Sequence, residues 1–217
     1  MSFYKTLWMA VLVGCAANLT AANVPALATD LPSPGAGNVA TAVLSGGCFW
    51  GVEAVYERLT GVIDVVAGYA GGKAADAQYE KVETGRTGHA ESVQITYDPS
   101  QISYGKLLQV FFAVVHDPTE IDRQGPDFRP QYRSVIFYSS DAQKKVAQAY
   151  IAQIERARVF SDPIATRVSV LPGFFPAEES HQHFIQRNPG NPYVVQNDLP
   201  KLRALAKQFP ELLKQQP

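Results

Sequence analysis

The sequence predicts an α+β fold in two layers, with helices packed on one sheet. Apolar, β-branched segments alternate with segments of helical periodicity in the order strand, helix, strand, strand, helix, strand. Neither an internal repeat nor a second domain boundary interrupts that order. Hydrophobic residues make up 46% of the 217 residues, which supports a packed core and excludes a disordered chain. The order predicts a two-layer α/β sandwich with a ferredoxin-like split β-α-β core and additional C-terminal helices.

The first half of the domain is predicted to alternate strands with one helix. Residues 39–45 are apolar and end at two glycines, which is typical of a buried strand before a tight turn. Apolar residues then recur at helical spacing up to Leu59. Residues 62–67 are β-branched and predict a second strand, and the glycine-rich stretch 68–72 predicts a loop. Residues 90–97 alternate with period two and predict a third strand.

The second half is predicted to be richer in helix. The expected elements are a buried helix over 107–115, strands over 132–138 and 166–171, a helix over 141–158, and two C-terminal helical segments. Asp141 is expected to cap the long helix, because a short acidic side chain can accept hydrogen bonds from the free N–H groups of the first turn. Pro200 and Pro210 are expected to break the C-terminal segments.

The N-terminal residues resemble an export signal. Lys5 is the only charged residue before Asp30, and it precedes the apolar run 7–13. Ala26-Leu27-Ala28 matches the small-residue pattern of a signal cleavage site. The apolar run is shorter than the roughly 20 residues that a transmembrane helix needs. A buried N-terminal helix is the alternative, against which Lys5 and the small residues argue.

The predicted organisation is an export signal over 1–28, a flexible Pro/Gly linker over 29–38 and one domain over 39–217. A second route stays open, because Leu12-Val13-Gly14-Cys15 resembles a bacterial lipoprotein box in which Cys15 would carry the lipid and become the new N-terminus. Both routes predict an exported, periplasmic protein, lipid-anchored only in the second case. Both leave Cys48 as the one free thiol.

The charge balance and the histidines exclude two classes of function. Lys plus Arg is 19 and Asp plus Glu is 20, with no basic tract, so no nucleic-acid partner is expected. The four histidines, at 89, 116, 181 and 183, form no H-E-x-x-H pattern, and two cysteines cannot build a Cys-based zinc site. We therefore predict no metal.

The sequence GGCFWGVE at residues 46–53 is the most informative stretch. Its glycines allow a strand to turn abruptly into a helix and place Cys48 at the first helical turn. Unpaired N–H groups and the helix dipole would favour a thiolate there and lower the thiol pKa. A lone cysteine is more often a buried structural residue, but the glycines and the neighbouring Phe49 and Trp50 favour a reactive one.

These residues resemble the peptide methionine sulfoxide reductase A family, whose signature is GCFWG followed shortly by Glu. Further blocks that resemble the family, between about residues 39 and 188, are GYAGG at 68–72, YEKV at 79–82, GRTGHAE at 85–91, HDPT at 116–119, QG at 124–125, QYRS at 131–134 and EESHQ at 178–182. The order of these blocks is highly specific. The resemblance implies a thiol-dependent enzyme that reduces the S epimer of methionine sulfoxide, in proteins or as the free residue.

The resemblance also implies catalytic roles. Cys48 would attack the sulfoxide sulfur, Glu91 would protonate the oxygen, and Tyr79 and Tyr132 would donate hydrogen bonds to that oxygen. The residues agree for Glu91, which lies on the apolar face of its predicted strand, where desolvation raises a carboxyl pKa. A buried carboxyl satisfied by backbone donors is the structural alternative.

Substrate-binding roles follow from the same resemblance. Phe49 and Trp50 would hold the terminal methyl group, Asp127 would contact the substrate backbone, and Glu53 would support the site from one helical turn away. Many relatives carry C-terminal cysteines that resolve the oxidised cysteine, but this chain has none after Cys48. We therefore expect regeneration by an external thiol, either a thioredoxin-like protein or a small thiol. We also expect a monomer without a bound cofactor.

Two other functions compete with this interpretation. A cysteine hydrolase would need a histidine base oriented near the thiol, which no spacing in the sequence indicates. A non-catalytic binding domain would use the aromatic residues alone and would retain binding after Cys48→Ser. The Cys, Glu and Tyr positions argue against the binding domain.

Overall fold

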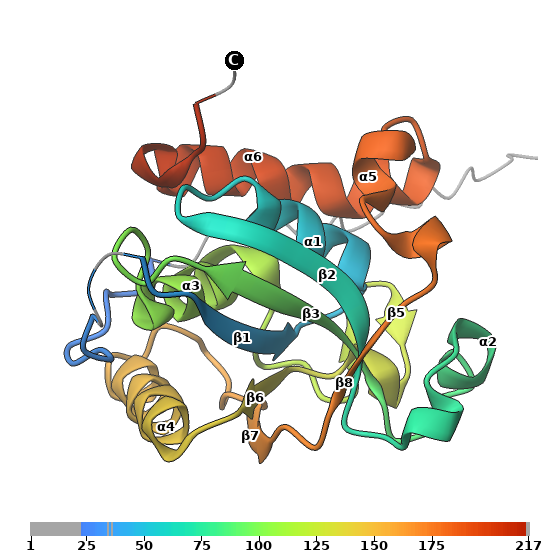
Figure 1. The fold of residues 1–217 in the computed structure, drawn as a ribbon, viewed down its shortest axis with the longest axis horizontal. Helices are drawn as coiled ribbons and strands as arrows, with labels where there is room; N and C mark the ends of the chain where they lie inside the picture. Colours follow the sequence, from blue (N-terminus) through green and yellow to red (C-terminus); the bar gives the residue numbers. More distant parts are fainter. Residues whose placement is uncertain (1–22, 34, 36, 216–217) are drawn as a thin grey trace, which may run out of the picture.

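The computed structural model describes residues 23–33, 35 and 37–215 as one six-stranded mixed sheet with helices (Figure 1). The strands are β1 (Ala40–Ser45), β2 (Val62–Ala70), β3 (Ala90–Tyr97), β6 (Val135–Tyr138), β7 (Arg167–Val170) and β8 (Phe174–Pro176), and a separate hairpin pairs β4 (Arg123–Gln124) with β5 (Asp127–Phe128). The α-helices are α1 (Phe49–Glu57), α2 (Tyr79–Val82), α3 (Tyr104–Val110), α4 (Asp141–Arg156), α5 (Phe184–Arg187) and α6 (Leu199–Gln208). Two π-helical turns, Phe111–Val115 and Val194–Asp198, follow α3 and precede α6.

The strand order is β7-β6-β1-β3-β2-β8. Its four central strands, β6, β1, β3 and β2, pair antiparallel with one another, whereas β7 pairs parallel with β6. The strands β1 and β2 are therefore parallel, with β3 between them and α1 connecting them. This is the split β-α-β core that the sequence predicts. Helices α1 and α3 lie behind the sheet in Figure 1, α6 packs on α1, and α4 packs against β6 and β7.

Alternation along β3 divides the buried side chains between the two faces of the sheet. Val93, Ile95 and Tyr97 join the main core under the helices, whereas Ala90 belongs to a smaller cluster on the other face. Glu91 shares the parity of Val93. Its carboxyl therefore faces the helical layer, on the side where α1 begins.

The glycine-rich stretch 68–72 was predicted to be a loop, but only its last two residues lie outside β2. Residues 68–70 continue β2 and pair with β8, which the sequence analysis missed. Gly68 permits this pairing, because a Cβ there would lie 2.4 Å from the backbone oxygen of Phe175. The pairing partner comes from more than a hundred residues away in sequence, so local pattern could not reveal it.

Three predicted boundaries shift by a few residues. The strand predicted from 132 begins at Val135, because Pro130–Tyr132 forms a 3₁₀ turn. Ser140, not Asp141, caps α4 by accepting the Gln143 N–H. Pro200 does not break a helix but lies in the first turn of α6, where its missing N–H costs nothing.

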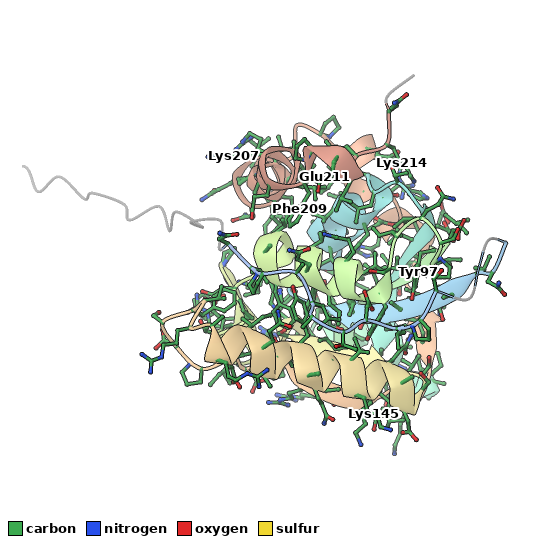
Figure 2. All side chains as sticks on the ribbon, turned by 90° about the vertical axis from the view of Figure 1, so that its left-hand side faces the viewer. Tyr97, Lys145, Lys207, Phe209, Glu211 and Lys214 are labelled. Carbon is green, nitrogen blue, oxygen red and sulfur yellow. The ribbon has the colours of Figure 1, made fainter. Side chains whose placement is uncertain are left out.

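Residues 23–33 lie against the fold, along α3 and α4 (Figure 2). The Val24 side chain is buried, and its carbonyl accepts a hydrogen bond from Gln109 Nε2 at 2.8 Å. Tyr150 Oη donates to the Pro25 carbonyl at 2.7 Å, and both oxygens of Asp30 accept from the Gly105 N–H at 2.9 Å. Residues 29–33 therefore differ from the flexible linker predicted there.

The predicted apolar run 7–13 and Cys15 lie outside the described residues. Within the described part of the chain, no helix has the length and apolar character needed to cross a membrane.

Candidate active site

The backbone between β1 and α1 positions Cys48. The strand ends at Ser45, and Gly47 takes a φ of +98°, a conformation that favours glycine. A Cβ at Gly47 would lie 2.7 Å from Cγ of Gln124, so the position also lacks room for a side chain. Cys48 follows as the N-cap residue of α1, as predicted, and its side chain is 8% exposed.

The ionisation of Cys48 differs from the prediction. Burial raises the pKa of its thiol well above the ordinary value, and the carboxylates of Glu91 and Asp198 raise it further. The Trp50 backbone N–H and the Lys201 ammonium lower that pKa by less. Desolvation and negative charge therefore outweigh the helix N-terminus, and the ligand-free site holds a thiol at neutral pH.

Glu91 faces the same turn from β3. Its side chain is 3% exposed, and Oε2 accepts a hydrogen bond of 3.0 Å from the Phe49 N–H, one residue after Cys48. Burial raises the pKa of Glu91 to about 8, although the Phe49 bond lowers it. The carboxyl is therefore mostly protonated at neutral pH, the state that a proton donor needs.

Two half-buried phenols complete this group. Burial raises the pKa of Tyr79, to about 12, and that of Tyr132, and the charges of Glu91 and Cys48 raise both further. The Glu178 carboxylate anchors the first residue of α2 by accepting the Tyr79 N–H at 2.9 Å. The four predicted catalytic residues therefore lie close enough to interact, and both phenols keep their protons as hydrogen-bond donors.

An aromatic wall lies beside these residues. The Trp50 indole stacks on Phe184 with ring centroids 3.7 Å apart, and its Nε1 donates to His181 Nδ1 at 3.2 Å. Tyr193 meets Trp50 edge-on at 5.9 Å, and its hydroxyl donates to Asp127 Oδ2 at 2.5 Å. Asp127 and Trp50, both predicted to bind substrate, are thus linked through Tyr193.

Phe49 is more deeply buried than Trp50, with which it was predicted to hold the methyl group. Its ring is 1% exposed and packs against Tyr69 and His181, with centroids 5.9 and 5.4 Å apart. Trp50, by contrast, stays partly exposed. In the ligand-free structure, Phe49 therefore supports the wall from behind.

Tyr193 and His181 lie at the site, although the sequence predicted no site role for either, and His181 was weighed only among the histidines that form no metal-binding pattern. Both come from the C-terminal segment after β8, which folds back over α1. The EESHQ block at 178–182 carried a signal for His181, but Tyr193 stands in a short polar loop without a distinctive pattern. Only the tertiary fold brings it to Asp127.

One group of side chains among the described residues could hold a cation. Glu53, Glu57 and His183 each offer a ligand atom, and these atoms lie within 4.8 Å of one another. His183 already pairs with Glu57, and burial raises the pKa of Glu53 to about 7. The cluster therefore consists of a partly exposed ion pair and a carboxyl that is about half protonated at neutral pH.

Comparison with known proteins identifies the family. Residues 40–213 match the family described as peptide methionine sulfoxide reductase. The chain is 52% identical over 177 residues to peptide methionine sulfoxide reductase MsrA 2 of Mesorhizobium japonicum, covering 82% of this chain and 91% of that protein. It is 54% identical over 175 residues to the MsrA 2 of a Synechocystis species, covering 81% and 82%.

Solved structures agree with the sequence comparison. The reduced form of Mxr1 from Saccharomyces cerevisiae superposes with a TM-score of 0.63 at 33% identity, covering 75% of this chain and 92% of that one. Methionine sulfoxide reductase A of Corynebacterium diphtheriae gives a TM-score of 0.60 at 32% identity, covering 71% and 77%. The chain that holds Cys48, Glu91 and the two phenols in this α+β fold belongs to the peptide methionine sulfoxide reductase A family and is an oxidoreductase that reduces methionine sulfoxide.

Proposed function

We propose that the chain reduces the S epimer of methionine sulfoxide, free or in proteins, with Cys48 as nucleophile and Glu91 as proton donor. The observation that carries this proposal is the convergence of a lone thiol and a protonated carboxyl on one turn, with Glu91 hydrogen-bonded to the residue after Cys48. A sulfoxide oxygen cannot leave sulfur as an oxide ion, so a proton donor at this place has a defined task.

The reaction transfers one oxygen. The Cys48 thiolate attacks the sulfoxide sulfur as Glu91 gives its proton to the oxygen, and the hydroxyls of Tyr79 and Tyr132 stabilise the developing charge there. The attack forms a bond between the two sulfurs. This bond and the S–O bond of the substrate then break as the protonated oxygen is transferred to the cysteine sulfur. The methionine sulfur gains two electrons, the cysteine sulfur loses two, and the products are methionine and the sulfenic acid of Cys48. Because burial keeps the ligand-free thiol protonated, attack requires substrate binding to favour its ionisation.

An external thiol completes the cycle. The sequence has no cysteine after Cys48, so no C-terminal residue can form a disulfide with it. Two equivalents of a small thiol, or one dithiol of a thioredoxin-like protein, would reduce the sulfenic acid to thiol and release water and a disulfide.

The aromatic wall supports a role in substrate binding. The partly exposed Trp50 face offers an apolar surface for the methyl group, and Asp127, held by Tyr193, offers an acceptor for a substrate N–H. Both assignments extend the predicted roles of Trp50 and Asp127, with Phe49 behind them.

We further propose that the chain is exported to the periplasm and processed upstream of residue 23. The N-terminal sequence supports export. The packing of Val24 and the bonds to the Pro25 and Ala26 carbonyls support the retention of residues 23–28, which argues against cleavage after Ala28. Lipid attachment at Cys15 is the route that keeps this segment.

The decisive experiment is reduction of a dabsylated methionine sulfoxide, supplied as separate S and R epimers, with dithiothreitol as reductant. We expect turnover of the S epimer only, and none by the Cys48→Ser variant, because a serine hydroxyl is a far poorer nucleophile at neutral pH. Turnover by Cys48→Ser, or equal rates with both epimers, would refute the proposal. Acyl-enzyme formation from a chromogenic ester would instead indicate a hydrolase, and substrate binding without turnover would indicate a binding domain.

A further inference from the structure

A buried ion pair lies between α1 and the C-terminal helix. Lys201 Nζ is 3.1 Å from Asp198 Oδ1, and the two side chains are 7% and 0% exposed. The second carboxylate oxygen of Asp198 is buried and accepts no hydrogen bond from the described residues. Such a pair costs desolvation free energy and adds little net stability, so its presence calls for another explanation.

The pair occupies the place of a missing side chain in the first turn of α1. A Cβ at Gly51 would lie 2.2 Å from Asp198 Oδ1 and 2.8 Å from Lys201 Nζ. Gly51 is the third residue of α1, and Cys48 is the N-cap residue of the same turn. The glycine therefore admits both charges to the turn that carries the reactive sulfur.

Both charges act on Cys48, in opposite directions. Lys201 lowers the pKa of the Cys48 thiol and also that of Asp127, whereas Asp198 raises both. The other titratable groups that face this space are Glu91 from β3, His116 after the π-helical turn, and the phenols of Tyr79, Tyr132 and Tyr193. Burial lowers the pKa of His116 to about 4, so that ring is neutral. Lys201 is thus the side-chain cation in this group.

We propose that Lys201 is a positioning residue for the reaction, held under the first turn of α1 by Asp198, where its charge favours the Cys48 thiolate against the surrounding carboxylates. This rests on the proposed role of Cys48 as nucleophile. Asp198 has two opposed effects, because it fixes the ammonium in place and also disfavours the thiolate. The pair therefore sets how readily substrate binding can ionise the buried thiol.

The test measures the ionisation of Cys48 without the sulfoxide reaction. In a full-length Cys15→Ser background, Cys48 is the single thiol, and its alkylation by iodoacetamide is followed between about pH 6 and pH 10. Each variant is compared with the wild type through the ratio of their alkylation rate constants at the same pH, below the thiol pKa, and we expect this ratio to fall about tenfold for Lys201→Met. Lys201→Arg keeps the charge and should change this ratio by less than about threefold. Asp198→Asn should raise the ratio.

Lys201→Met and Asp198→Asn should change the alkylation rate of Cys48 in opposite directions if the pair acts through charge. If the pair were merely structural, both substitutions would change that rate in the same direction. Unchanged ratios, or shifts in the same direction, would overturn the proposal. If circular dichroism shows that Lys201→Met does not fold, Asp198→Asn decides, and an unchanged or lower ratio overturns it. Failure of the wild type to reduce methionine sulfoxide would refute the proposed function, while these alkylation ratios would still report on Lys201.

Discussion

At the residue scale, Glu91 and Cys48 show how burial suits two groups differently. Removal from water disfavours the charged form of each, which keeps Glu91 protonated, as its proposed role requires, but opposes the thiolate that the proposed attack by Cys48 requires. The same buried environment therefore favours the protonated form of both groups, which suits a proton donor but not a nucleophile. Substrate binding must reverse this for Cys48 alone, and the cation of Lys201 acts in that direction.

The proposed proton donation by Glu91 predicts how the sulfoxide-reduction step, before regeneration by thiol, depends on pH. Glu91→Gln keeps the hydrogen bond to Phe49 but cannot donate a proton, so single-turnover reduction should slow about 10²–10⁴-fold. The ratio of the wild-type rate to the variant rate should fall as pH rises through about 8, where Glu91 ionises, because ionisation of Cys48 raises both rates with pH but only the wild type loses a proton donor. Stopped-flow quenching measures both. An unchanged single-turnover rate would place the proton donor elsewhere.

The same substitution should stabilise the fold near neutral pH. The unfolded carboxyl ionises near its ordinary pKa of 4.5, whereas the folded one keeps its proton to about 8. Unfolding therefore releases a proton between these values, so wild-type stability falls as pH rises through this window. Glu91→Gln should gain on the order of 2–3 kcal/mol at neutral pH and nothing at about pH 4. Urea denaturation at both pH values measures this, and a gain that does not change with pH would contradict it.

The sequence predicts some residues of the site better than others. The GGCFWGVE turn and the period-two strand place Cys48 and Glu91 by local rules alone, and the structure brings both to one turn. The raised pKa of Cys48 was not predictable in this way, because burial is a property of the whole fold. Tyr193 and Lys201 were also missed, since amphipathic C-terminal segments predict packing and not which charges reach the cysteine.

At the scale of elements, the sequence pattern fails to predict the strands of two or three residues. The central strands and the long helices have clear periodicity and are confirmed, apart from their ends. Strand β8 has three residues and forms because β2 offers a free edge, which no local signal encodes. The hairpin of β4 and β5, which carries Asp127, was also missed, because its sequence is typical of a polar loop.

The N-terminal segment is an element whose contribution can be measured. A chain without residues 1–28 should be less stable than one without residues 1–22 by about 2–4 kcal/mol, because it loses buried Val24 and removes the acceptors of Gln109 Nε2 and of the Tyr150 hydroxyl. Tyr150→Phe is the matched control. It removes only the bond to Pro25 and should cost about 0.5–1.5 kcal/mol. Equal stability of the two truncated chains would show that the segment contributes nothing.

At the scale of the whole molecule, the order of strands and helices was sufficient to predict the fold. The split β-α-β core follows from the order of consecutive elements along the chain, and the confirmed strand order β6-β1-β3-β2 has this arrangement. The C-terminal segment returns over α1 and completes the site with Tyr193, Asp198 and Lys201, and it carries no cysteine. The described residues therefore assemble the proposed reducing site around Cys48, the one cysteine among them.

The most direct measurement counts methionine and oxygen in the absence of reductant. Cys15→Ser protein, in which Cys48 is the only thiol, is mixed with excess methionine S-sulfoxide, and products are followed by chromatography and intact mass. We predict one methionine per chain and one added oxygen on Cys48, trapped by dimedone and removed by small thiols. The unsubstituted mature protein should give the same result if Cys15 is removed or lipidated. Two methionines per chain, or a loss of two hydrogens in the monomer, would show that a second thiol resolves Cys48 and would contradict the account.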